Sequence, residues 1–192
     1  MKRNSAFITC LLIVLCSSYQ KANTQIAVIP VPVKLVETKG VFSLPENVII
    51  NAPALPELQQ TVLFLQQRLQ AATGYPVKTS DEAAAGSIKL ELNKTADAVI
   101  GNEGYSLSVT PEGVLLKANK PAGLFYGVQT LLQLFPKEIE SAVAVKSVKW
   151  ELPCAEITDY PRFGWRGLLF DVSRHFFTKQ EVKEFIDQMA RY

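Results

Sequence analysis

The sequence has 192 residues, a length that suits one globular domain or slightly more. Hydrophobic residues make up 48% of it, so the chain can build a core, and a disordered protein is not expected. The formal net charge of +2, without a basic block, argues against nucleic acid or an anionic membrane surface as a partner.

The beginning of the chain has the order of a secretory signal peptide. Lys2 and Arg3 precede an apolar run at residues 6–16, and two serines follow it. This run is shorter than the roughly 20 residues that cross a bilayer, which argues against a membrane-spanning anchor. We therefore expect residues 1–18 to be a signal peptide, residues 19–25 to be a tether, and the protein to be exported.

Cysteine usage gives two further expectations. Cys16 lies where a bacterial lipoprotein is acylated, but Leu15 stands where such signals carry a small residue. A soluble periplasmic or extracellular protein is therefore preferred, and a lipoprotein, with membrane contact only through Cys16, stays open. Removal of the signal peptide takes Cys10 and Cys16 with it and leaves Cys154 without a disulfide partner.

Residues 26–136 are predicted to form an α+β domain with an antiparallel sheet and two helices. In the helical stretches, apolar side chains recur at three- and four-residue steps, and proline or glycine marks the ends. Elsewhere apolar and polar residues alternate, as in a sheet that is covered on one face. The expected helices cover residues 56–73 and 122–135, and the expected strands cover an entry segment at 26–36, a hairpin across Lys39–Gly40, and residues 48–50, 87–92, 105–109 and 114–118.

The chain changes character after this domain. Residues 137–159 are predicted to be a connector. Residues 165–170 then form a nearly continuous apolar run, typical of a strand buried on both faces of a parallel sheet. Thr178 and Glu181 have the spacing of a capping box, so a helix is expected to follow them. A single strand–loop–helix unit cannot bury its own apolar face, and we therefore expect residues 160–192 to belong to a larger parallel array.

Stretches from both parts of the chain resemble one enzyme family. Residues 161–192 closely resemble the opening of the catalytic barrel of family 20 glycoside hydrolases, the β-N-acetylhexosaminidases, in the stretch PRFGWRGLLFDVSRHFFTKQEVKEFIDQMARY. The N-terminal accessory domain of that family is similar to this chain in IPVPVKLVETKGVFSLPENVII and in GLFYGVQTLLQLFP. These motifs come from two domains, occur in the family's order and extend over nearly all of residues 26–192.

The resemblance implies a (β/α)₈ barrel preceded by a smaller α+β accessory domain. It also implies an enzyme that removes terminal N-acetylglucosamine or N-acetylgalactosamine from glycans, and it implies no metal and no cofactor. In this family the acetamido oxygen of the sugar attacks the anomeric carbon, in place of the usual carboxylate nucleophile. An adjacent Asp–Glu pair assists, because the Asp orients the acetamido group and the Glu protonates the leaving oxygen.

The sequence departs from the family because its barrel segment, residues 160–192, does not contain this Asp–Glu pair. A (β/α)₈ barrel has about 250 residues, and residues 160–192 correspond only to its start. The single Asp–Glu dipeptide of the sequence, Asp81–Glu82, falls in a loop of the accessory domain. We therefore expect a truncated barrel, no catalytic residue in this chain and no activity of the chain alone. A non-catalytic accessory module that binds glycan or a partner protein stays open as the alternative.

The resemblance suggests a role for Arg166. This residue matches the family's Arg that contacts hydroxyls of the terminal sugar, and a guanidinium offers a fixed fork of donors to two such hydroxyls. The alternative is a structural ion pair, for example with Asp171. Asp171, Arg174 and His175 follow the expected strand, on the side where barrels carry their active sites. For these three residues we prefer a packing role, or support of the residues that contact substrate.

Overall fold

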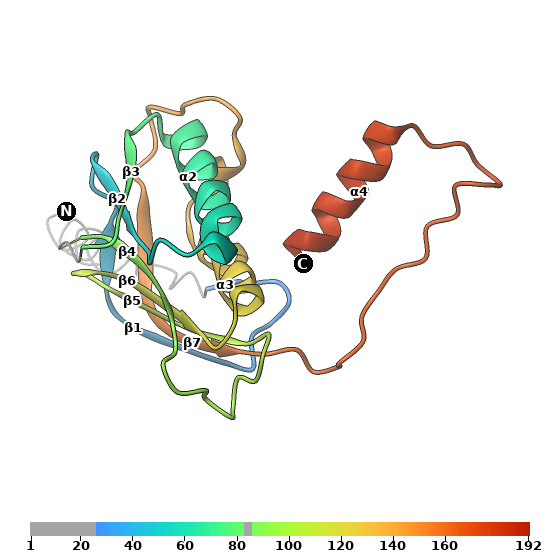
Figure 1. Ribbon diagram of the computed structural model, residues 1–192. Helices are drawn as coiled ribbons and strands as arrows, with labels where there is room; N and C mark the ends of the chain where they lie inside the picture. The colour runs from blue at the N-terminus through green and yellow to red at the C-terminus, as the bar shows by residue number, and fades with distance from the viewer. Residues whose placement is uncertain (1–25, 83–85) are drawn as a thin grey trace, which may run out of the picture.

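The computed structural model describes residues 26–82 and 86–192, and in this part of the chain a seven-stranded sheet carries two helices on one face (Figure 1). The predicted signal peptide, residues 1–18, and the predicted tether, residues 19–25, lie outside the described residues. Among the described helices, none has the length and apolar character that crossing a membrane requires.

The bounds of the elements are as follows. The strands are β1 (Lys34–Ser43), β2 (Val48–Asn51), β3 (Val77–Ser80), β4 (Ile88–Leu92), β5 (Tyr105–Thr110), β6 (Gly113–Ala118) and β7 (Glu151–Asp159). The helices are α2 (Gln59–Thr73), α3 (Pro121–Leu134) and α4 (Lys179–Arg191), with short 3₁₀ helices η1 (Pro56–Leu58) and η2 (Lys137–Glu140).

The α+β class is confirmed, but the sheet is mixed, so the prediction of an antiparallel sheet holds for one half of the sheet and is wrong for the other. The strand order is β1-β7-β5-β6-β4-β2-β3. The neighbours from β1 to β6 are antiparallel, whereas β6, β4, β2 and β3 run parallel to one another. The parallel pairing of β2 with β3 is possible because η1 and α2 form a crossover between these strands, which a parallel connection requires.

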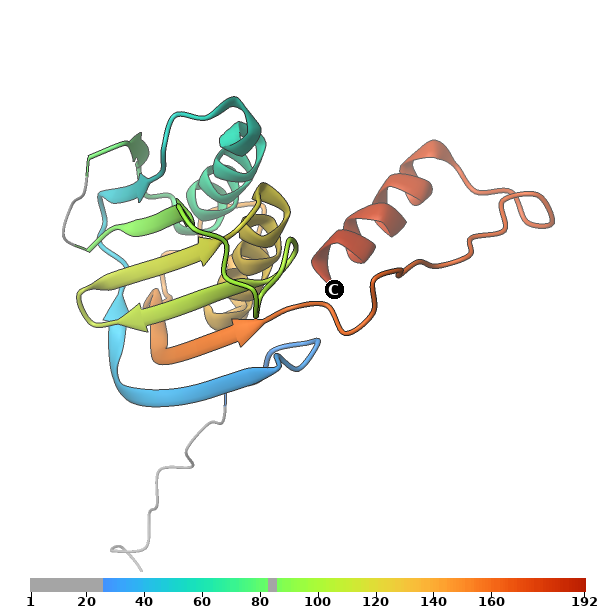
Figure 2. The ribbon, with the colours of Figure 1, turned by 60° about the horizontal axis from the view of Figure 1, so that its bottom comes forward.

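The core lies between the sheet and the two helices α2 and α3, which lie side by side on the same face (Figures 1 and 2). In β5 every second side chain is buried, as the pleat of a strand dictates. These side chains meet the apolar stripes of the helices, where Leu65 and Leu69 of α2 and Leu124 and Leu131 of α3 are fully buried. Burial of this apolar surface is the main driving force for folding of the domain.

The helix ends follow the signals in the sequence. Pro56 opens η1, and Gly74, with a φ of 71°, adopts the left-handed conformation that ends α2. Pro121 is the first residue of α3, where its missing N–H leaves no hydrogen bond unmade. The helices predicted at residues 56–73 and 122–135 are therefore confirmed.

The hairpin predicted across Lys39–Gly40 is wrong, because β1 continues through these residues. The register of β1 against β7 shifts between Glu37 and Val41, and Gly40 within the shift has a φ of 118°. This is a β-bulge, which inserts residues and bends a strand without ending it. The long partner β7 pairs with both halves of β1, and this pairing keeps the strand continuous.

The predicted connector, residues 137–159, is wrong in its second half, because residues 151–159 form β7 in the interior of the sheet. Pro153 argued against a strand here, because proline has no N–H to donate to the hydrogen-bond ladder of a sheet. It pairs with Val41, directly beside the β-bulge, where the ladder is already interrupted. The bulge in one strand therefore accommodates the proline in the other.

Of the two elements predicted near the end of the chain, the helix is formed and the strand is not. The capping box of α4 is confirmed: the Thr178 hydroxyl accepts from the Glu181 N–H at 3.3 Å, and the Glu181 carboxylate accepts from the Thr178 N–H at 2.7 Å. The strand predicted at residues 165–170 is not formed, and Trp165 and Leu169 are 86% and 96% exposed. No described strand lies beside these residues to complete a ladder, so their backbone stays extended without pairing.

Gly123 of α3 lies too close to the backbone of Gly104 to accept a side chain. A Cβ atom at position 123 would lie 2.2 Å from the Gly104 carbonyl oxygen and 2.9 Å from Ala118 Cβ. We expect Gly123→Ala to lower the free energy of unfolding by about 1–3 kcal/mol, because α3 must move off the sheet. Urea unfolding followed by circular dichroism measures this change. Gly164→Ala is the control, since its Cβ would meet nothing within 4 Å; equal midpoints for the two variants would contradict the prediction.

Candidate functional site

Arg166 is held by contacts with the accessory domain. Its Nη1 and Nη2 atoms donate to the Glu103 carboxylate at 3.3 Å, and Nη1 also donates to the Phe163 carbonyl oxygen at 2.7 Å. The Arg166 Cζ atom lies over the Tyr126 ring, 5.9 Å from its centroid. The hydrogen bonds to Glu103 are the main reason that the pKa of Arg166 lies above its ordinary value. The ion pair considered for Arg166 therefore forms with Glu103 and not with Asp171, while sugar contact stays a prediction.

Asp171, Arg174 and His175 are close to one another in the loop before α4. Asp171 Oδ1 accepts from the N–H groups of Ser173 and Arg174 at 2.9 and 3.1 Å, and Asp171 Oδ2 pairs with Arg174 Nη1 at 2.9 Å. His175 Nδ1 lies 3.4 Å from the Phe176 carbonyl oxygen. These bonds stabilise a local turn, and the packing or supporting role expected for the three residues stays a prediction.

A groove of ≈ 1080 Å³ separates the accessory domain from the C-terminal segment. Its walls come from α3, from the extended residues 160–168 and from α4. Arg166 and Glu103 both line the groove, whereas the three residues of the loop before α4 do not. The residues predicted to form one site are therefore divided between the groove and a separate turn.

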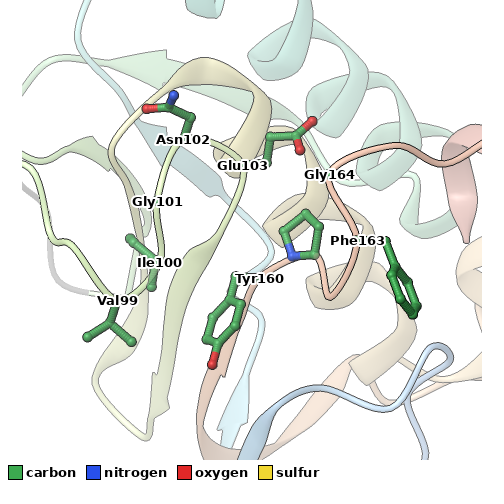
Figure 3. Close-up of a pocket in the computed structure, with 9 residues that line it drawn as sticks. Val99, Ile100, Gly101, Asn102, Glu103, Tyr160, Phe163 and Gly164 are labelled. Carbon is green, nitrogen blue, oxygen red and sulfur yellow. The ribbon is translucent and has the colours of Figure 1, made fainter.

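A smaller pocket of ≈ 220 Å³ is also lined by Glu103 (Figure 3). The loop between β4 and β5 supplies one wall with residues 99–103, and Tyr160, Phe163 and Gly164 supply the opposite wall. Glu103 lines both this pocket and the groove. Its carboxylate is thus one of the contacts between the accessory domain and the start of the C-terminal segment, beside that of Tyr126.

The inner end of the groove holds a buried hydroxyl pair. The Tyr105 hydroxyl lies 2.5 Å from Thr130 Oγ1 and 3.5 Å from Asp159 Oδ2, and Asp159 Oδ1 accepts from the Val33 N–H at 3.0 Å. Tyr105 is 2% exposed. Burial, reinforced by the nearby Asp159 carboxylate, raises the pKa of Tyr105 well above its ordinary value, so its hydroxyl stays protonated and available as a donor.

The groove offers polar and aromatic contacts to a ligand. Arg166 and the side-chain amide of Gln129 supply hydrogen-bond donors, and Tyr126 and Trp165 supply ring faces. Within residues 26–82 and 86–192, no three His, Cys, Asp or Glu side chains are grouped to hold a metal ion. The dipeptide Asp81–Glu82 is exposed at the end of β3 and does not line the groove.

Glu103 and Tyr126 are the contacts of Arg166 that sequence reasoning did not identify. Glu103 is 63 positions away from Arg166 in the chain, and a local spacing pattern cannot report such a contact. Glu103 lies in the loop between β4 and β5, and Tyr126 lies on α3. The apolar residues of α3 are explained by packing against the sheet, so Tyr126 carried no separate signal of a contact with Arg166. Only the folded chain brings them together.

Comparison with known proteins gives consistent matches for both parts of the chain. The profile described as glycosyl hydrolase family 20, domain 2, matches residues 25–160, and the profile of that family's catalytic domain matches residues 163–192. A β-hexosaminidase of Porphyromonas gingivalis is 32% identical over 97% of this chain and 25% of the relative. A β-N-acetylhexosaminidase of Cellulomonas fimi is 33% identical over 87% of this chain and 32% of the relative.

A solved structure agrees with these matches. The N-acetyl-β-hexosaminidase of Streptomyces plicatus is 38% identical, with a TM-score of 0.78, over 86% of this chain and 32% of that one. This chain therefore spans 25% of the length of the Porphyromonas relative and 32% of the length of the other two.

The raised pKa of Tyr105 predicts a pH-dependent contribution to stability. As the pH rises above about 10, the unfolded state loses the phenolic proton before the folded state does, so the contribution is full below this pH and is lost above it. We expect Tyr105→Phe to lower the free energy of unfolding by about 1–3 kcal/mol at pH 8, because Thr130 loses its partner. Urea midpoints at pH 8 and at higher pH should show this difference shrinking. A difference that does not change with pH would contradict the assignment.

Proposed function

The chain belongs to glycosyl hydrolase family 20, and from this premise we propose that it is the N-terminal part of an exported β-N-acetylhexosaminidase. The whole enzyme removes terminal N-acetylglucosamine or N-acetylgalactosamine from glycans. The observation that carries the proposal is the order of the matches, with domain 2 of the family over residues 25–160 and the catalytic domain over residues 163–192. Export is supported by the signal-peptide pattern of residues 1–18.

The proposed reaction is substrate-assisted hydrolysis. The acetamido carbonyl oxygen of the sugar bonds to the anomeric carbon while the glycosidic C–O bond breaks, and a Glu donates its proton to the leaving oxygen. A neighbouring Asp accepts a hydrogen bond from the acetamido N–H and stabilises the positive charge that develops. Water then opens the cyclic intermediate with retained configuration and returns a proton to the Glu. We place this Asp–Glu pair outside the 192 residues.

The contribution of this chain to the site is Arg166. Its two terminal nitrogens donate to two neighbouring sugar hydroxyls in the proposed complex. Arg166 lines the groove, and its contact with both oxygens of Glu103 supports this role, because the guanidinium there bonds to a pair of oxygen acceptors. Since Glu103 uses the same nitrogens, the sugar has to displace this carboxylate in order to bind.

The first test is hydrolysis of 4-nitrophenyl N-acetyl-β-D-glucosaminide by the purified 192-residue chain. We expect no turnover above the blank, because the proposal assigns the acid that protonates the leaving oxygen to another part of the protein. The Streptomyces plicatus enzyme is the positive control. Turnover by the chain would contradict the assignment of the Asp–Glu pair to another part of the protein.

The second test concerns Arg166 in an active context. Residues 26–192 replace the matching part of the Streptomyces plicatus enzyme, and the chimera is expected to hydrolyse the same substrate. Arg166→Ala in this chimera should lower kcat/KM by roughly 10- to 150-fold, the effect of losing charged hydrogen bonds of about 1.5–3 kcal/mol. Lys183→Ala on the exposed side of α4 is the control. An inactive but folded chimera would count against the family function, and an unchanged kcat/KM for Arg166→Ala would count only against the role of Arg166.

A further inference from the structure

The sequence contains one acceptor motif for N-linked glycosylation, Asn93-Lys94-Thr95. Such a motif has an asparagine followed two positions later by serine or threonine, with any residue except proline between them. The chain has seven asparagines, and the other six lack serine or threonine at that distance. The motif is short, so the accessibility of its residues decides whether a transferase can use it.

The motif lies where the chain leaves the sheet at the end of β4. The Asn93 N–H still donates to the Ala118 carbonyl oxygen at 2.8 Å, and residues 94 and 95 form a bend outside the strands. Residues 94–99 are all exposed, and the loop between β4 and β5 protrudes from the end of the sheet (Figure 1). A transferase can therefore reach this bend while the sheet stays intact.

The Asn93 side chain is half-buried at the base of the loop, where its Nδ2 atom donates to Asn119 Oδ1 at 2.9 Å. A side-chain amide has two N–H donors, and glycosylation replaces one of them, so one donor is left for Asn119. The Asn119 amide also donates to the carbonyl oxygens of Asp97 and Gly101 at 2.7 and 2.6 Å. Because these two bonds do not involve Asn93, they hold the loop whether or not Asn93 is modified.

We propose that Asn93 is an acceptor site for an N-linked glycan, which is transferred from a lipid-linked oligosaccharide during export. Nδ2 forms a bond to the anomeric carbon of the first sugar, while the bond from this carbon to the lipid pyrophosphate breaks and the pyrophosphate leaves with the electron pair. Nδ2 gives one proton to a base of the transferase, and Thr95 is the second residue of the motif that the transferase requires. The site rests on the export proposed above, and not on the glycosidase activity.

A glycan at this position leaves the candidate site open, because residues 93–95 line neither the groove nor the smaller pocket. Its effect is on the loop itself. Exposed loop tips are preferred sites of proteolytic cleavage, and a glycan is a bulky, hydrophilic group. The modification should therefore protect the loop between β4 and β5 from proteases.

Cell-free translation of the full chain with microsomal membranes tests the site, because these vesicles supply both the transferase and its lipid-linked oligosaccharide. Resistance to a protease added outside the vesicles measures export, and a gel shift that an N-glycosidase reverses measures glycosylation. We expect a protected chain that carries one glycan. Asn93→Gln and Thr95→Ala should abolish the shift, whereas Thr95→Ser should keep it, since serine also completes the motif.

Asn102→Gln is the matched control, because Asn102 lies in the same loop but is followed by Glu103 and Gly104 and is not part of a motif. This variant should keep the shift. A protected chain without a shift, or a shift that survives Asn93→Gln, would overturn the site and leave export standing. A chain that the protease degrades would contradict export, and the proposed site would fall with it.

Discussion

Strand β7 is the constraint on which the position of the whole C-terminal segment depends. It lies between β1 and β5 and is hydrogen-bonded along both edges, so its direction and its end point are determined by its neighbours. Asp159 closes the strand, where its carboxylate accepts from the Val33 N–H and lies beside the buried Tyr105 hydroxyl. Residues 160–192 therefore leave the sheet at one defined place, beside the start of the chain's first strand and the face covered by α3.

The close approach of α3 to the sheet gives the groove its inner wall. Gly123 and Gly127 allow this approach, because a Cβ atom at position 127 would lie 2.3 Å from Leu116 Cδ1. With its glycine side against the sheet, α3 turns Tyr126 and Gln129 toward the groove. The same helix thus fills the core with one face and lines the candidate site with another, which links the stability of the accessory domain to the geometry around Arg166.

The two parts of the chain are stabilised by different forces. In the accessory domain, side chains such as Leu65, Leu107 and Leu131 are fully buried, and each large apolar side chain removed from water contributes about 1.5–3 kcal/mol. In residues 160–192 the aromatic side chains stack mainly on one another, and contact with the accessory domain depends on exposed ion pairs worth about 1 kcal/mol or less each. A large apolar surface that stays exposed in this way is typical of a surface that another protein element covers.

Features that depend on residues close together in the chain were predictable from the amino-acid sequence. The α+β class, the two helices of the accessory domain, the capping box of α4 and the alternation of β5 all follow from periodicity and from the conformational limits of proline and glycine. The resemblance of residues 161–192 to the start of the family's catalytic barrel was also recognisable from the sequence, because it depends on the order of the residues and not on their contacts.

Features that depend on pairing between residues far apart in the chain required the folded structure. Pro153 argues against a strand at β7, and a strand there is possible because the β-bulge at Gly40 lies opposite the proline. Lys39–Gly40 has the composition of a turn, but β1 continues through it because β7 pairs with both halves of β1. In the same way, residues 165–170 have the composition of a strand but form none, because a strand exists only with a partner ladder. The contact between Glu103 and Arg166 is of this kind too: their electrostatic attraction acts only after the sheet has brought two loops, 63 positions apart in the chain, to the same edge of the domain.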